Sequence, residues 1–316
     1  MYNDGLKRRF VSETTDLEAR RKMALYFDAI ESFERAYSKD IYAFSVEEVE
    51  DVVAGFGSAR TSSSTSGILR TIKRYVAWCS SHGVEGTSDA AYHACVNQPA
   101  NMRVSMVASP KHLSDVLGVL FHQPSMHSTD DVVAAYVWMA FSGLPEDATI
   151  LLTSDDFSVE HKIISFNGIE YPLYDESLSI FSSCIESDSF ASVSERCKVV
   201  KPRVHGSLVL RSISGKPNLP TLRTKLARKV GGMIESGLNV PTISYSRVWL
   251  SGVFYRLFER EKSGAAIDLL SDTPEEITRQ ISQSKAQMTT RYRNHCIRQY
   301  ESDYLAWKQA FYPNTP

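Results

Sequence analysis

The chain has 316 residues, of which 43% are hydrophobic and 23% charged, and its formal net charge is −2. This length suits two hydrophobic cores. No apolar run approaches the roughly 18 residues needed to span a membrane, and the N-terminus lacks a signal-peptide apolar region, so we expect a cytoplasmic protein with no membrane partner. The five cysteines are widely spaced without a CxxC or Cys/His cluster, which argues against a disulfide framework or zinc site and predicts neither a metal nor a cofactor.

The first hundred residues have the apolar spacing of helices. Residues 15–37 carry apolar side chains three and four positions apart, which predicts a long helix. Ser45 followed by Glu48 is a capping box for a short second helix that stops at Gly57. We therefore predict a helical domain over residues 1–100.

A third helix is predicted after the polar run ARTSSSTSG, in the segment ILRTIKRYVAWCSSHG. Its apolar side is separate from a side that carries Arg70, Lys73 and Arg74, and Gly83 ends it. These three cations form either a solvated face or a phosphate-binding face, which the amides at the preceding helix start would also favour.

Residues 101–110 are expected to be a linker, and residues 111–316 a second domain. Helical patterns begin it, in SPKHLSDVLGVLFHQ and TDDVVAAYVWMAFSG, and return from Asn218 to the end of the chain. Between them, two short apolar runs flank Asn167-Gly168, the strongest hairpin signal in the chain. The predicted fold class is mainly α with a small β-hairpin or sheet.

The net charge conceals a strong polarity in the second domain. Residues 130–195, the acidic block, hold thirteen acidic side chains and one basic; residues 196–262, the basic block, hold fourteen basic and three acidic, a local balance near +11. Local charge decides whether a surface attracts phosphate. The basic block is either an ordinary solvated surface or a DNA-binding face. Its candidate DNA contacts are Lys201, Arg203, Lys216, Arg223 and Arg228.

Several segments in this order resemble the tyrosine recombinases of the phage-integrase and Xer type, over about residues 15–295. The N-terminal helices resemble their core-binding (SAM-like) domain, which forms half of a clamp on DNA in that family. FSGLPEDATILLTSDDF, the hairpin ending in Tyr-Pro-Leu, ISYSRVWLSGVF and SQSKAQMTTRYRNH resemble successive parts of their catalytic domain. The resemblance implies a core-binding domain followed by a tyrosine-recombinase-like catalytic domain with a C-terminal helix.

Strand cleavage in that family needs a tyrosine nucleophile, two arginines that bind the phosphoryl oxygens, a lysine acid and assisting histidines. By resemblance, Tyr292 stands at the nucleophile position and Arg247 at the second arginine. They are 45 residues apart, about a dozen more than usual, so Arg256 or Arg260 are alternatives to Arg247.

The remaining catalytic positions are replaced. Pro145 stands at the first arginine, Ser244 and Gln283 at the histidines, and the Asn167-Gly168 turn at the lysine, although Lys162 is nearby. Each lost charge donor typically costs about 2.7–4 kcal/mol of transition-state stabilisation. Little cleavage is expected unless a basic side chain such as Lys201, Arg203, His205 or Lys216 enters the site.

Three functions remain open. The first is a nucleoid-associated duplex-DNA-binding protein that is catalytically impaired and serves as an accessory, regulatory or architectural factor in recombination. The second is an active recombinase that uses Tyr292, and the third is a non-enzymatic scaffold whose basic block meets an acidic partner or its own acidic block. The aromatic stripe Tyr300, Tyr304, Trp307 and Phe311 packs either on its own chain or on a partner. The family resemblance favours homo-oligomers on DNA, with a companion recombinase as a further partner.

Overall fold

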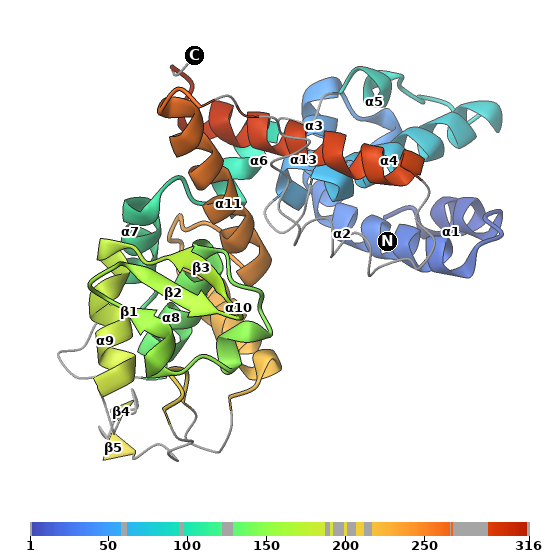
Figure 1. Cartoon of the computed structure of the whole chain (residues 1–316). Helices are drawn as coiled ribbons and strands as arrows, with labels where there is room; N and C mark the ends of the chain where they lie inside the picture. The colour runs from blue at the N-terminus through green and yellow to red at the C-terminus, as the bar shows by residue number, and fades with distance from the viewer. Residues whose placement is uncertain are drawn as a thin grey trace. The chain divides into compact units, whose positions relative to one another are not determined.

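The computed structural model describes residues 2–57, 62–94, 98–121, 129–186, 190–191, 199–200, 207–211, 217–265, 267 and 290–314. The chain divides into two compact units, Met1–Met102 and Arg103–Pro316. Helices dominate both units, and a small antiparallel sheet lies in the second (Figure 1). The predicted fold class is therefore confirmed. Within the described ranges, no helix has the length and apolar character that crossing a membrane requires.

The first unit is built from helices whose ends follow local sequence signals. Asp16 accepts hydrogen bonds from the amides of Glu18 and Ala19 at the start of the second helix. The capping box is confirmed, because the Ser45 amide donates to Glu48 (2.7 Å) and the Glu48 amide donates to the Ser45 hydroxyl (3.3 Å). The helices of this part are α1 (Asp4–Ser12), α2 (Leu17–Tyr37), η1 (Ile41–Ala43), α3 (Val46–Gly57), α4 (Ser62–Ser81) and α5 (Ala90–His93), and α6 (Gln98–Ser105) spans the boundary between the units.

Two features of this unit differ from the sequence expectation. The helix expected after the polar run starts within it, because α4 begins at Ser62. Serine and threonine cost only a few tenths of a kcal/mol in a helix, so a helix held by its buried apolar side extends through them. The sequence also did not predict α1, which buries Phe10 and Lys7.

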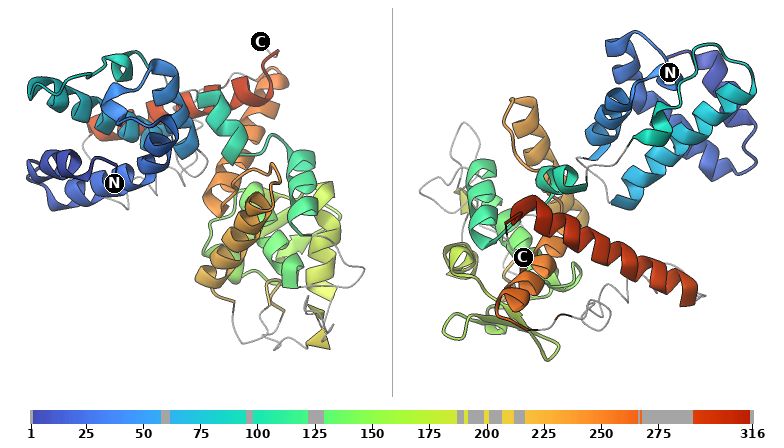
Figure 2. Two further views of the ribbon diagram at one scale, coloured as in Figure 1. Left: turned by 180° about the vertical axis from the view of Figure 1, so that it is seen from behind. Right: turned by 90° about the horizontal axis from the view of Figure 1, so that it is seen from above.

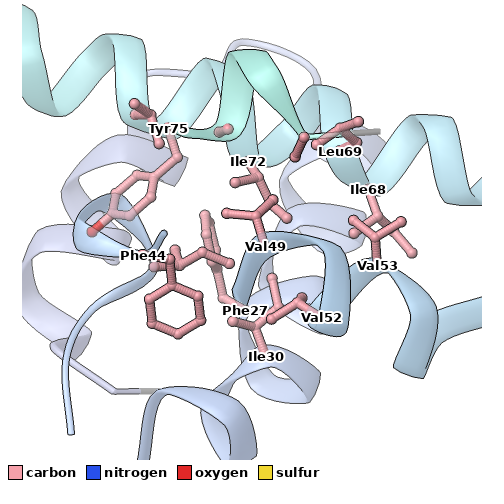
Figure 3. Close-up of a cluster of buried hydrophobic side chains, with 14 of the residues drawn as sticks. Phe27, Ile30, Phe44, Val49, Val52, Val53, Ile68, Leu69, Ile72 and Tyr75 are labelled. Carbon is pink, nitrogen blue, oxygen red and sulfur yellow. The ribbon is translucent and has the colours of Figure 1, made fainter. Parts of the chain in front are cut away.

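The core of the first unit lies where the apolar sides of α2, α3 and α4 meet (Figure 3). Phe27 and Ile30 come from α2, and Ile72 and Tyr75 from α4; all four are fully buried. The predicted helical spacing therefore identified the buried side of both helices. Gly83 follows α4 with a φ of +67°, a left-handed conformation that glycine adopts without strain.

A buried group of charges joins α1 to the rest of this unit. Lys7 Nζ donates to both carboxylate oxygens of Glu34 and to the Tyr2 carbonyl (2.8 Å), and it lies 3.9 Å from Asp40. The Tyr75 hydroxyl donates to Asp40 (3.3 Å). Burial raises the pKa of both carboxyl groups, although Lys7 opposes the rise. One lysine therefore faces two buried carboxyl groups.

In the second unit, helices precede and follow the three-stranded sheet along the chain. Residues 101–110, expected to be a linker, comprise the end of α6, a segment in which Met106 and Val107 are fully buried, and the start of the next helix. Ser109 caps that helix by accepting from the His112 amide (3.2 Å). The elements are α7 (Pro110–Leu120), α8 (Thr129–Ser142), β1 (Phe157–Ser158), β2 (Ile163–Phe166), β3 (Ile169–Pro172), α9 (Leu178–Glu186), β4 (Phe190–Ala191), β5 (Val199–Val200), α10 (Leu219–Glu235), α11 (Tyr245–Lys262) and α13 (Thr290–Phe311), with short 3-10 turns at Ala148–Ile150, Ser154–Asp156 and Asp175–Ser177.

The sheet contains the predicted hairpin. Strands β1, β2 and β3 pair antiparallel in that order, with Phe166 opposite Ile169. Asn167 (φ 50°) and Gly168 (φ 77°) are both left-handed, as a type I′ turn requires. The Asn-Gly prediction is therefore confirmed, with β1 as an additional strand.

Helix α8 is the centre of this unit. Residues 132–141 are all buried, which explains why its sequence is apolar on every side. It crosses α11 at Gly252, where an added Cβ would lie 1.9 Å from the Phe141 carbonyl oxygen. The two backbones are therefore in direct contact, and only glycine fits at this crossing.

The C-terminal helix α13 packs on its own unit (Figure 2). Trp307 is fully buried, packs against Phe254 in a tilted arrangement (5.9 Å between ring centroids) and donates through Nε1 to the Val107 carbonyl (3.0 Å). Tyr300 and Tyr304 also contact Phe254. Of the two alternatives for the aromatic stripe, packing within the chain is the one observed.

Candidate functional site

The segment FSGLPEDA forms a tight turn at the end of α8. Gly143 has a φ of +99°, and the Leu144 amide donates to the Met139 carbonyl (3.1 Å), which closes the helix. Pro145 follows, half-buried, at the position expected for the first catalytic arginine. Proline carries neither a charge nor a backbone N–H, so this position has no donor for an anion.

Helix α11 holds this turn with side-chain donors. A helix end leaves carbonyl groups without partners, and three of them at the α8 terminus are satisfied from α11. The pairs are Tyr245 Oη to Leu144 O (2.8 Å), Trp249 Nε1 to Gly143 O (2.9 Å) and Arg256 Nη1 to Phe141 O (2.7 Å). The two segments that resemble the first and second arginine boxes are therefore brought together.

Glu146 places a carboxylate directly after Pro145, the position expected for the first arginine. Arg223 of α10 donates to it through Nε (2.6 Å) and Nη2 (2.5 Å), and the buried Tyr136 hydroxyl donates to the same carboxylate. Burial works against the charged form, but Arg223 and Tyr136 hold the pKa of Glu146 below its usual value. Arg223, a predicted DNA contact, is thus engaged by a carboxylate of its own unit.

Arg247, the predicted second arginine, is buried in α11. The residue is only 7% exposed, and within the described part of the chain its Nη2 has no hydrogen-bond partner. Burial lowers its pKa, and the charge of Asp303 in α13 opposes this. Ser244, at the expected histidine position, is the exposed residue before α11, and its side chain makes no capping hydrogen bond.

Arg256, one of the alternatives to Arg247, lies against the turn itself. Its Nη2 is 2.5 Å from the place that a Cβ of residue 143 would occupy, so the guanidinium fills the space beside Gly143. Its hydrogen bond to the Phe141 carbonyl gives it a capping role there. A guanidinium is therefore present beside Gly143, two residues before Pro145, but it binds a backbone carbonyl.

Five of the predicted site residues have side chains that lie outside the described part of the chain. Tyr292 belongs to α13, but its side chain is outside what the structure describes. Gln283, Lys201, Arg203 and Lys216 also lie outside the described residues.

Two groups of cations are placed on helix surfaces. Arg70 and Arg74 are exposed on α4 and Lys73 is half-buried, and no ion pair is described for them. On α10, Arg228 is exposed on the side opposite the buried Leu222, Leu226 and Val230. Lys225 is exposed three positions before Arg228; sequence analysis did not select it, although the helical period puts it outside the buried stripe.

Comparison with known proteins identifies the first unit. Residues 1–81 match the protein-family model "MrpR, N-terminal core-binding domain". The predicted N-terminal core-binding domain is therefore confirmed. No match to a curated protein was found.

The chain is also similar to solved structures of integrases. It aligns with the Tn1549 transposon integrase in complex with circular intermediate DNA at 12% identity and a TM-score of 0.37, covering 92% of this chain and 97% of that one. A complex of a variant of that integrase with transposon right end DNA aligns at 11% identity and a TM-score of 0.36, covering 85% of this chain and 88% of that one. A lambda integrase dimer bound to a COC′ core site aligns at 13% identity and a TM-score of 0.31, covering 82% of this chain and 69% of that one.

Proposed function

We propose that this protein binds duplex DNA through a recombinase-type body and does not cleave it. The core-binding match of residues 1–81 carries the proposal, together with the exposed cations of α4 in that domain. Exposed Arg and Lys without carboxylate partners are free to contact phosphates. The basic block would add a second contact through Lys225 and Arg228 of α10. The protein would serve as an accessory, regulatory or architectural factor at a recombination site.

The turn after α8 supports the absence of cleavage. A phosphoryl transition state needs positive donors, whereas Pro145 has none and the neighbouring Glu146 is negative. Arg223 is bound to that carboxylate and Arg256 to a backbone carbonyl. Among the described residues, the two guanidinium groups that contact the turn, those of Arg223 and Arg256, therefore have other partners in the free protein.

We expect Arg70→Ala/Arg74→Ala to weaken binding to a mixed-sequence duplex of about three helical turns. Each lost phosphate contact lowers the slope of log affinity against log salt by about 0.9, so the pair should lower it by about 1.8. Fluorescence anisotropy across a salt series measures both quantities. Arg35→Ala is the control, because Arg35 already pairs with Glu31 (2.6 Å) and should leave the slope unchanged. A wild-type affinity that does not respond to salt, or no binding at low salt, would contradict DNA binding.

Cleavage is tested separately with a pool of nicked duplexes of random sequence. An active tyrosine recombinase would form a covalent adduct on such substrates, because the nicked strand departs and prevents religation. We expect no adduct on a denaturing gel. An adduct that Tyr292→Phe abolishes would establish the active recombinase instead.

The scaffold alternative is favoured by ion pairs between the acidic and basic blocks, including Arg223–Glu146 and Lys229–Asp130 (2.6 Å). It predicts oligomers that form without DNA and no affinity for DNA. Light scattering with and without the duplex separates it from homo-oligomerisation on DNA, which we propose as the mode of assembly.

A further inference from the structure

The acidic block and the basic block are joined along α10. Arg223 and Lys229 lie on opposite sides of the buried stripe of this helix, and each reaches a carboxylate near one end of α8, Glu146 and Asp130. Lys229 Nζ also lies over the Phe121 ring at 5.8 Å. The outward-facing cations of the same helix have no described ion pair. The cations of α10 thus fall into a paired set and an unpaired set.

The Glu146–Arg223 pair is anchored on its acidic side. The Tyr136 hydroxyl, from a fully buried residue of α8, donates to the carboxylate. The Thr149 hydroxyl donates to the Glu146 carbonyl (2.7 Å) and so holds the backbone of the turn. The Glu146 side chain is only 20% exposed. Its position is therefore set by the fold rather than by Arg223.

The basic side of the pair is open to solvent. The Arg223 side chain is 58% exposed although it makes two hydrogen bonds to the carboxylate. Two oxygens of a phosphate group can accept both N–H donors of a guanidinium, as the two oxygens of a carboxylate do. An external phosphate can therefore reach Arg223, but it competes with an oxygen pair that is already in place.

We propose that Glu146 is an internal counter-anion that occupies Arg223 in the free protein and limits the strength of DNA binding. This inference rests on the proposed DNA-binding function. Arg223 therefore contributes little to the affinity for DNA, because an incoming phosphate must first displace the anchored carboxylate. Removal of the Glu146 charge frees Arg223 as an additional phosphate contact.

The test is Glu146→Gln in the full chain, with a mixed-sequence duplex as the probe. Glutamine keeps the size of the side chain and an oxygen for the Tyr136 hydroxyl, while the negative charge is removed. We expect affinity to rise by about threefold to tenfold and the salt slope to become steeper by about 0.9, which is one further phosphate contact. Asp115→Asn is the matched control, because it removes the same charge from an exposed pair with Lys111 on α7 (3.2 Å) and should leave both quantities near the wild-type values.

Arg223→Ala in the wild-type background gives a second test, which does not require the glutamine variant to fold. We expect less than about a twofold change in the wild-type background. In the Glu146→Gln background, the same substitution should remove the whole gain. A large loss from Arg223→Ala alone would show that Arg223 already contacts DNA and would overturn the inference. Unchanged or weaker binding by Glu146→Gln would also overturn it, whereas the absence of binding by every variant and by the wild type would overturn the proposed function itself.

Discussion

We expect Lys7→Met to lower the free energy of unfolding of the first unit by about 3–5 kcal/mol. The substitution removes the only cation that contacts Glu34 and Asp40 in this buried group, as far as the described residues show. Both carboxyl groups then remain in an apolar environment without a compensating charge. Helix α1, which is nine residues long and marginal on its own, also loses its connection to α2.

Hydrogen exchange on the full chain measures this effect, because amides of α2 and α4 report the first unit while those of α8 report the second. Lys22→Met is the control. Lys22 pairs with Glu18 on the exposed face of α2 (3.2 Å), so its loss should cost about 0.5 kcal/mol or less. A loss below about 1 kcal/mol for Lys7→Met would show that the buried pair contributes little.

The deficit of Lys7→Met should depend on pH. Burial raises the folded-state pKa of Glu34 and Asp40 above their unfolded values, so the stability they contribute is present at low pH and is lost as pH rises through the folded pKa. Without Lys7 both pKa values rise further. The difference from wild type should therefore be larger at about pH 8 than at about pH 5. Repeating the exchange measurement at these two values checks the sign.

A second large effect is expected from Gly252→Ala at the crossing of α8 and α11. The added Cβ would lie 1.9 Å from the Phe141 carbonyl oxygen and 2.7 Å from its carbon, and a backbone cannot turn aside as a side chain does. The helices must separate, which we expect to cost about 3 kcal/mol or more, at the upper end of overpacking. The donors of α11 that hold the turn after α8 would also be displaced.

Gly118→Ala in α7 is a matched control for this substitution. Among the described residues, nothing beyond the helix's own backbone lies within 4 Å of the Cβ position at Gly118, so alanine should stabilise the helix by about 0.5–1 kcal/mol. Thermal unfolding of the full chain and exchange in α8 and α11 should therefore change in opposite directions for the two variants. A neutral Gly252→Ala would mean that the crossing readily widens.

Structure that depends on near neighbours was predictable from the residues alone. The Ser45–Glu48 capping box, the Asn167-Gly168 turn and the Ser109 cap each depend on partners within about four positions or on a φ angle that few residues adopt. Apolar spacing likewise identified the buried sides of α2 and α4, because a helical period determines which residues share a face.

Partners far apart in the sequence were decided only by tertiary structure. Lys7 belongs to a segment that reads as polar, and it is buried because Glu34, 27 positions away, supplies its counter-charge. That is why α1 was missed. The aromatic stripe of α13 had two possible partners by sequence, and contact with Phe254 decided between them.

The candidate site shows the same division. The sequence by itself predicted that Pro145 stands at the position expected for the first arginine, and it determined that the basic block is rich in cations, because composition and order are read directly from the residues. It could not determine that Arg223 meets Glu146 across 77 positions, or that Arg247 is buried near Asp303. Charge along a chain is additive, whereas the pairing of charges depends on which helices pack together. Tertiary packing therefore decides which cations of this protein remain free for phosphate.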